Sequence, residues 1–222
     1  MKSIIISKHT LFIKNDQNIF STGSSIESFL IKNDTPYICI KHPLNNVSSS
    51  LGEDFVKNRK INSVKMYPSS LVELFRKGKL EKQIITYKNS SFLPLKTIQE
   101  FFITLQVINK QKKRFDIFIG IDPLNALYGL ILKRLGRVKK VIFYTADYAI
   151  IRFNNPLMNR IYHFIDRFVS KNSDQVWNVS TRIASLRKKQ GIPDKKNYFV
   201  PNSPPFNKDL IKDTKNINNH EI

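Results

Sequence analysis

The sequence predicts a single α/β domain: a mostly parallel sheet with helices on both of its faces. Two observations between residues 115 and 202 favour this class. Short apolar runs rich in strand-forming residues alternate with longer segments of helical apolar spacing. Two of the helical segments also open with a capping residue followed by proline, Asp122-Pro123 and Asn155-Pro156. Strands that alternate with helices pair in parallel through right-handed crossovers, so ligands are expected at the carboxyl ends of the strands.

The helices of this segment have recognisable ends. The first begins at Pro123 and is closed by Gly136, and the last is capped by Ser180 and stopped by Gly191. The strands are expected at residues 115–121, 140–145, 174–179 and 198–201. For the helix that begins at Pro156, the expected buried stripe is Leu157, Ile161, Phe164, Ile165 and Phe168.

The N-terminal part has weaker signals. We expect a first strand at 3–7, a loop at 8–22, a helix from Ser24 and a second strand at 37–40. Further expectations are a polar loop at 42–60, a short strand at 61–67, a helical turn at 71–75, a strand at 83–87, and a helix at 95–110 with Ile98, Phe101, Phe102, Leu105 and Ile108 on its core side. The domain is expected to span residues 1–203, and 204–222 to be a disordered tail or the start of a linker.

Composition limits the possible classes. The net charge of +20 points to an anionic partner, although Lys, Asn and Ile are all abundant, as A- and T-rich codon usage would also produce. A single cysteine, Cys39, excludes a disulfide framework and favours a reducing compartment. No apolar run approaches the length of about 18 residues that a membrane span requires. The expected location is therefore the cytoplasm, or its membrane surface.

Several enzyme signatures are absent. The chain has no Gly-x-Gly-x-x-Gly, no P-loop and no Gly-x-Ser-x-Gly elbow. The four histidines lack metal-ligand spacing, so we predict no metal site.

The best candidate for chemistry follows the strand at 140–145. Asp147 could accept hydrogen bonds from sugar hydroxyls or act as a general base, and Arg152 could hold a phosphate or carboxylate, with Tyr148 beside them. The alternative is an internal Asp147–Arg152 ion pair that fixes the loop.

Two other sites have structural alternatives. Asp122 has the same strand-end position, where it could contact a ligand, but capping the helix at Pro123 would also explain it. Gly23 and Ser24 lie between the first strand and first helix, where backbone N–H groups can bind an anion. However, Ser24 and Glu27 also form the pattern of a capping box.

Four segments resemble the N-terminal domain of GT-B glycosyltransferases of the family-4-like type. They are Phe115–Gly129, Tyr144–Tyr148 with Arg152 and Phe153, Ser173–Ser180, and Val200–Asn202. Residues 3–7 and 22–30 fit the first strand and helix of that family, so the resemblance covers most of 1–203.

The resemblance implies a Rossmann-like domain that binds the acceptor, a glycan or lipid-linked molecule of polysaccharide or cell-envelope biosynthesis. The nucleotide-sugar donor, bound without an obligatory metal, would need a C-terminal GT-B domain in cis or as a separate subunit, so this chain is expected to bind no cofactor and to be inactive alone. Many members have a His-Asp pair where this chain has Ala146-Asp147.

Two non-catalytic interpretations remain. Arg182, Arg187, Lys188 and Lys189 lie on one face of the last helix, which could contact anionic phospholipid or simply be solvated. Nucleic-acid binding is supported by the net charge alone, because no basic stripe with interleaved aromatic residues is present.

Overall fold

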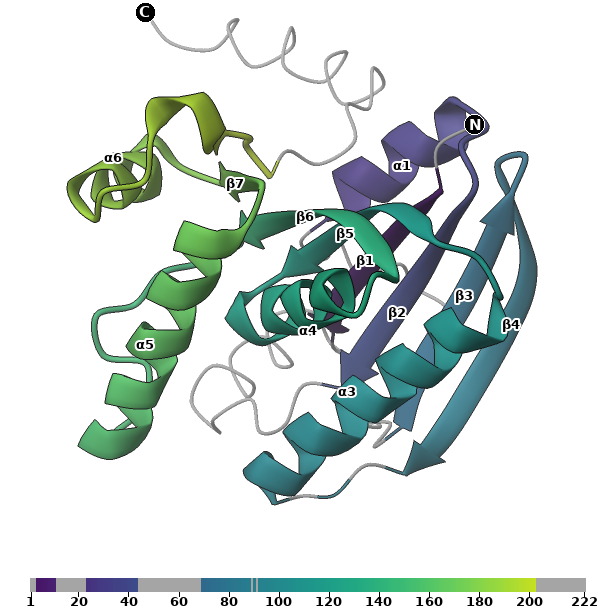
Figure 1. Cartoon of the computed structure of the whole chain (residues 1–222), viewed down its shortest axis with the longest axis horizontal. Helices are drawn as coiled ribbons and strands as arrows, with labels where there is room; N and C mark the ends of the chain where they lie inside the picture. Colours follow the sequence, from purple (N-terminus) through teal and green to yellow (C-terminus); the bar gives the residue numbers. More distant parts are fainter. Residues whose placement is uncertain (1–2, 11–22, 44–68, 89, 91, 203–222) are drawn as a thin grey trace, which may run out of the picture.

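The computed structural model describes residues 3–10, 23–43, 69–88, 90 and 92–202, which form one α/β unit (Figure 1). An eight-stranded sheet runs through it in the order β4-β3-β2-β1-β5-β6-β7-β8. All neighbouring strands are parallel except the β2–β3 and β3–β4 pairs, which are antiparallel. This confirms the predicted fold class. The strands are β1 (Ile4–Thr10), β2 (Tyr37–Pro43), β3 (Ser69–Arg76), β4 (Lys79–Lys88), β5 (Phe115–Ile121), β6 (Val138–Thr145), β7 (Gln175–Asn178) and β8 (Asn197–Phe199).

Helices cover both faces of the sheet. The described α-helices are α1 (Ser24–Lys32), α3 (Leu93–Lys110), α4 (Pro123–Arg134), α5 (Pro156–Asn172) and α6 (Thr181–Lys189). On one face, Ile4 and Ile6 of β1 belong to the same apolar cluster as Leu30 of α1. Ile5, between them, points to the opposite face and belongs to the cluster that contains Ile108 of α3 and Leu132 of α4. Figure 1 shows α3 and α4 crossing that second face.

The predicted helix starts are confirmed. Asp122 accepts a hydrogen bond from the Asn125 N–H at 3.0 Å, and Ser180 caps α6 through the Ile183 N–H at 3.2 Å. Asn155 accepts hydrogen bonds from the first N–H groups of α5. Polar caps therefore begin the three helices that follow β5, β6 and β7 in the chain.

Glycine permits the close packing of α4 on β5. A Cβ added to Gly120 would lie 2.4 Å from the backbone nitrogen of Ala126, which no side chain tolerates. This close contact holds the first turn of α4 directly over the end of β5, and so determines where Asp122 lies.

Three expectations for the N-terminal half need correction. The segment 71–75 is not a helical turn but part of β3, because pairing with β2 on one side and β4 on the other overrides its local pattern. β1 continues to Thr10, so His9 is in a strand and not in a loop. Ser24 is the first residue of α1, with Gly23 as the N-cap of the helix, and Glu27 pairs with Lys8, so the capping box is not formed.

The expected strand at 61–67, most of the loop at 42–60 and the tail at 204–222 lie outside the described residues.

Two helices present different faces from those expected. On α3, Ile98 and Phe102 are exposed, whereas the charged Lys96 and Glu100 are buried. On α5, the stripe formed by Leu157, Ile161, Phe164 and Phe168 is exposed, and only Ile165 of the expected set packs against the core.

α6 also differs from its expected basic face. Arg187 is fully buried and pairs with Asp166 of α5, so it does not belong to a solvated surface. Lys188 and Lys189 of the expected face are exposed.

Candidate functional site at the ends of strands β1 and β5

The strand order places a topological switch point between β1 and β5. The chain leaves β1 through α1 toward β2 on one side, whereas β5 continues through α4 to β6 on the other side. Ser7 pairs with Gly120, so His9 and Asp122, each two residues further along, lie side by side where the two strands end. Ligands bind at such points in open parallel sheets because the diverging loops leave a crevice there.

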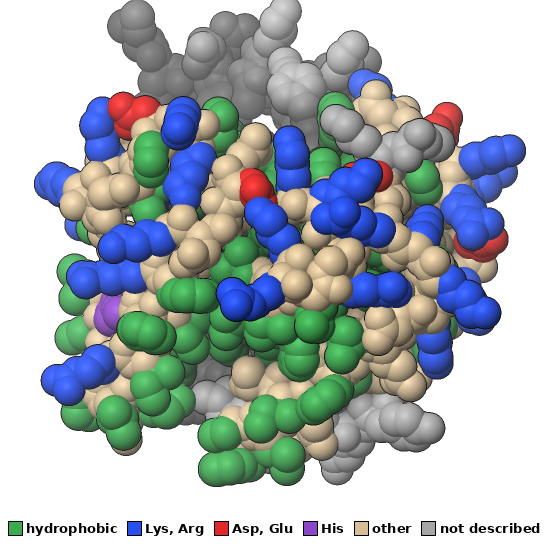
Figure 2. Space-filling view, viewed as in Figure 1, with side chains coloured by type: hydrophobic (Ala, Val, Ile, Leu, Met, Phe, Trp, Pro, Cys, Tyr) green, Lys and Arg blue, Asp and Glu red, His purple; other side chains and the backbone are tan. Residues whose placement is uncertain are grey.

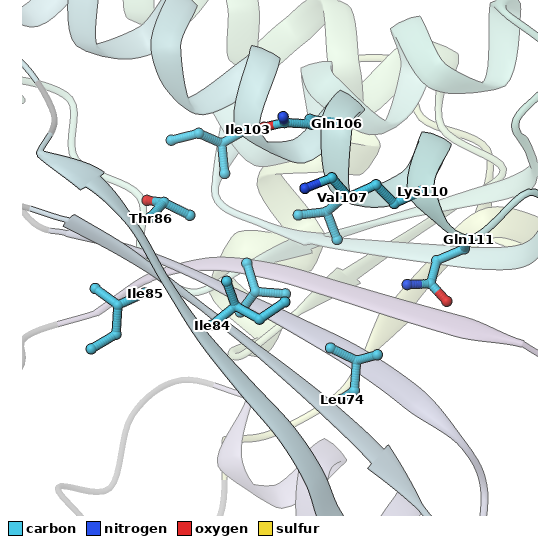
Figure 3. Close-up of a pocket in the computed structure, with 10 residues that line it drawn as sticks. Leu74, Ile84, Ile85, Thr86, Ile103, Gln106, Val107, Lys110 and Gln111 are labelled. Carbon is cyan, nitrogen blue, oxygen red and sulfur yellow. The ribbon is translucent and has the colours of Figure 1, made fainter.

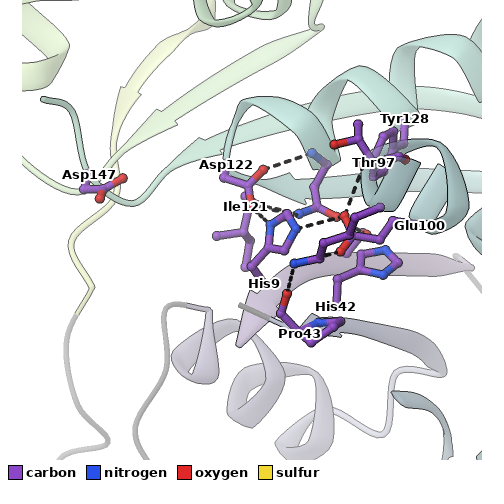
Figure 4. Close-up of polar contacts among 12 residues, drawn as sticks. His9, His42, Pro43, Thr97, Glu100, Ile121, Asp122, Tyr128 and Asp147 are labelled. Atoms are coloured by element: carbon purple, nitrogen blue, oxygen red, sulfur yellow. Dashed lines mark hydrogen bonds and ion pairs between the residues drawn. The ribbon is translucent and has the colours of Figure 1, made fainter. Parts of the chain in front are cut away.

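A charged network fills this position (Figure 4). Nδ1 of His9 lies 2.6 Å from Oδ2 of Asp122, and its Nε2 lies 3.1 Å from Oε2 of Glu100 on α3. Lys96, one helical turn before Glu100, approaches the other oxygen of that carboxylate to 3.3 Å. Asn125 donates to Oδ2 of Asp122 at 2.8 Å. Three elements distant in sequence thus supply one connected set of charges.

The pKa values of His9 and His42 shift in opposite directions, although burial acts to lower both. Burial lowers the pKa of His42 to about 4, and this neutral ring contacts the hydroxyls of Ser70 and Thr104 at 2.9 and 3.2 Å. Burial would also lower the pKa of His9, but the charges of Asp122 and Glu100 and its hydrogen bonds to them raise it to about 10. His9 is therefore a cation at neutral pH and donates from both ring nitrogens.

The backbone of Asp122 is strained. Its φ of 84° and ψ of 162° fall in a region that is open essentially to glycine alone. A non-glycine residue there costs on the order of 1–3 kcal/mol, and such residues concentrate at functional sites. Here the N-cap bond, the His9 contact and the Asn125 side chain together hold Asp122 in place.

This arrangement suits recognition of hydroxyl groups better than proton abstraction. The pKa of Asp122 is lowered, because His9 and the two Asn125 donors outweigh the effect of burial, so the carboxylate stays ionised. A carboxylate offers about four lone-pair positions, of which His9 and the two Asn125 groups use three. The side chain remains 21% exposed, so one acceptor position is left for a ligand hydroxyl.

The structure brings two of the other predicted site residues, Gly23 and Ser24, to the same switch point as Asp122. A Cβ on Gly23 would lie 2.4 Å from Cδ1 of Ile121, so the start of α1 packs against the end of β5, and Ser24 opens the first turn there. The sequence-predicted Gly23, Ser24 and Asp122 therefore lie around the same switch point.

Asp147, Arg152 and Tyr148 lie at the next strand end instead. Asp147 pairs with Arg152, the alternative that the sequence left open, and its side chain is 64% exposed. Figure 4 shows Asp147 apart from the His9 network. The Tyr148 ring lies 5.4 Å from the Arg187 guanidinium, and its hydroxyl lies 3.5 Å from His163. The exposed Asp147–Arg152 pair is open to a ligand. Among the described residues no hydrogen bond joins it to the Asp122 network, but the charge of Asp122 helps Asp147 to raise the pKa of Arg152.

A second acidic group among the described residues lacks the chemistry of a metal site. Glu27, Cys39 and Glu73 have ligand atoms within 4.8 Å of one another. However, Lys8 pairs with Glu27, and Lys41 pairs with Glu73 at 2.6 Å. Burial, with the Glu27 charge, raises the pKa of the Cys39 thiol, which stays protonated. The charges of this group are already balanced.

An apolar cavity of about 380 Å³ lies between α3 and the β3–β4 hairpin (Figure 3). Among the described residues that line it there is no acidic or histidine side chain and no member of the His9 network. Its lining residues are Val72, Leu74, Ile84, Ile85, Thr86, Ile103, Gln106, Val107, Lys110 and Gln111.

Sequence reasoning missed His9, Glu100, Lys96 and Asn125. Continuing the first strand from residue 7 to residue 10 would have placed His9 at a strand end. Lys96, Glu100 and Thr104 recur at a spacing of four, which places them on one side of a helix, but nothing local in the sequence indicates that this polar side is buried.

Comparison with known proteins gives the fold and little more. The sequence matches no protein-family model and no curated protein. Among solved structures, the chain is similar to the catalytic domain of starch synthase IV from Arabidopsis thaliana, bound to ADP and acarbose, with a TM-score of 0.50 and 9% identity. The match covers 90% of this chain and 51% of that one, so the chain spans about half the length of its structural neighbour. None of the described helices is both long and apolar enough to cross a membrane. The described chain thus has a Rossmann-like α/β fold that it shares with part of a GT-B glycosyltransferase.

Proposed function

We propose that this chain is the acceptor-side half of a glycosyltransferase. Its similarity to about half of a glycosyltransferase catalytic domain supports this. The observation that carries the proposal is the ionised, partly exposed carboxylate of Asp122, held at the switch point by a His9 side chain that is cationic at neutral pH. A fixed carboxylate with a free acceptor position is suited to orienting a sugar hydroxyl.

The proposed division of labour follows from what the site offers. His9 has both nitrogens engaged, so it stabilises the Asp122 charge and does not take up a proton. The donor sugar nucleotide, its leaving group and the charge stabilisation for the transfer would come from a second domain. The acceptor would be a lipid-linked sugar or a polysaccharide end.

Glycan binding provides the first test. We expect the purified chain to retain a subset of oligosaccharides on a glycan array and Asp122→Asn to lose this binding. Asn keeps the volume and the capping ability of Asp. It removes the negative charge that pairs with His9 and that would accept the hydrogen bond of a ligand hydroxyl. Asp116→Asn is the matched control, because Asp116 pairs with Lys139 near the opposite end of β5.

Turnover provides the second test. We expect no sugar transfer when the chain alone is incubated with nucleotide sugars and the retained glycans. Turnover by the isolated chain would contradict the division between two domains. Unchanged glycan binding in Asp122→Asn would contradict the assigned site.

A further inference from the structure

The outer face of α5 has the composition of a membrane-surface helix. Leu157, Ile161, Phe164 and Phe168 lie on one side of the helix and are 63%, 44%, 70% and 44% exposed. Ile150, in the loop before α5, adds an apolar side chain that is 76% exposed, and its neighbour Ile151 is 75% exposed. Figure 2 shows hydrophobic side chains gathered at the lower left, where Figure 1 places α5, with Lys and Arg concentrated above them.

A buried ion pair holds this face outward. Asp166, on the opposite side of α5, accepts from Nη2 of Arg187 at 2.7 Å and from Nη1, and both side chains are enclosed. Turning α5 to bury its apolar stripe would expose Asp166 and leave the Arg187 charge without its partner in the interior. The exposed stripe is therefore a consequence of the specific packing of α5.

The charges around the stripe are of one sign. Arg160, Arg167 and Lys171 are exposed and, at helical spacing, follow one flank of the apolar stripe. The single acidic residue of α5 is the buried Asp166. The outer face of α5 thus combines Leu, Ile and Phe with Arg and Lys and carries no carboxylate, and the exposed Asp147 of the preceding loop is paired with Arg152.

We propose that this α5 face, with Ile150 and Ile151, docks onto an anionic phospholipid surface. An apolar stripe beside Lys and Arg is the pattern of a helix that lies in the plane of a membrane interface. A second copy of the chain is a poorer occupant, because it would bring the same cations and a net charge of +20 to the contact. This inference does not rest on the proposed transferase function.

Vesicle flotation tests the proposal with the whole chain. We expect flotation with vesicles of phosphatidylcholine and phosphatidylglycerol, and much less with phosphatidylcholine alone. Phe164→Ser with Phe168→Ser should lower partitioning by about tenfold or more, because both rings would lose their apolar contact. Arg160→Gln with Arg167→Gln should lower it by about fivefold for each charge removed.

Two control variants locate the contact. Lys188→Gln with Lys189→Gln removes the same charge from α6 and should leave flotation nearly unchanged. Phe102→Ser removes an exposed ring from α3 and should also have little effect. The exposed Leu95, Ile98 and Phe102 of that helix have no cation between them on the outer face, so they lack the charges that would attract anionic lipid. Unchanged melting temperatures would show that each variant is folded.

Three results would overturn the proposal. One is the absence of flotation with anionic vesicles, and another is flotation that the α5 variants leave unchanged. The third is sedimentation as a dimer that Phe164→Ser with Phe168→Ser converts to a monomer, which would identify a second copy as the occupant.

Discussion

Two clusters of buried charge differ in how open they are to solvent and in the strain of their backbone. Arg187 and Asp166, between α5 and α6, are 0% and 1% exposed, and aromatic rings of Phe143 and Tyr148 lie over the guanidinium. The His9–Asp122–Glu100 network is more open, since His9 and Asp122 are 15% and 21% exposed, and its backbone is strained. Burial of charge occurs in both, so burial alone does not indicate function. Partial exposure and strain distinguish the second.

The largest effect on stability is expected from breaking the buried Arg187–Asp166 ion pair. Arg187→Met leaves the Asp166 carboxylate buried without a partner and should lower the free energy of unfolding by about 3–5 kcal/mol. Adding Asp166→Leu should recover much of this loss, because apolar residues can replace a buried ion pair. Urea denaturation measures both. A double variant as unstable as the single one would contradict the interpretation.

The next effect is the pH dependence that His9 confers on stability. Its folded pKa of about 10 exceeds its ordinary value of 6.5, so its contribution is complete below about pH 6.5 and is lost as pH rises toward 10. The slope from this group can reach about 1.4 kcal/mol per pH unit. His9→Gln should flatten the fall in unfolding free energy between these pH values. His42→Gln is the comparison, because the lowered pKa of His42 leaves it neutral throughout that range.

The backbone strain at Asp122 predicts a smaller difference in stability between two variants at this position. Asp122→Ala and Asp122→Gly both remove the carboxylate, but only glycine adopts the local φ without cost. We expect the alanine variant to be the less stable by about 1–3 kcal/mol in chemical denaturation. Equal stabilities would show that this backbone conformation is not strained in solution.

The smallest effect on stability is expected from removing the charge of Asp147, which forms an exposed ion pair with Arg152. Asp147→Asn should change the free energy of unfolding by less than about 1 kcal/mol, because solvent screens this ion pair. Thermal unfolding in low and high salt measures this. A larger loss would show that the pair holds the loop between β6 and α5 in place.

Local sequence patterns predicted the helices of the C-terminal half well, because the capping residues and prolines lie next to the helix starts that they specify. Asp122-Pro123, Asn155-Pro156 and Ser180 each identified a helix start from neighbouring residues alone. Predictions of helix faces were less successful. Apolar spacing shows that one side of α5 differs from the other, but Arg187, which decides which side is buried, comes from another helix.

The sequence alone therefore determined the alternation of strands and helices, the parallel class of the sheet and the strand-end position of Asp122, because these depend on contacts between near neighbours. Tertiary structure alone decided that His9 and Glu100 meet Asp122 and that α5 turns its apolar stripe outward. Both outcomes depend on strand order and on charge pairs between residues distant in the chain, and their energies appear only when those partners come together.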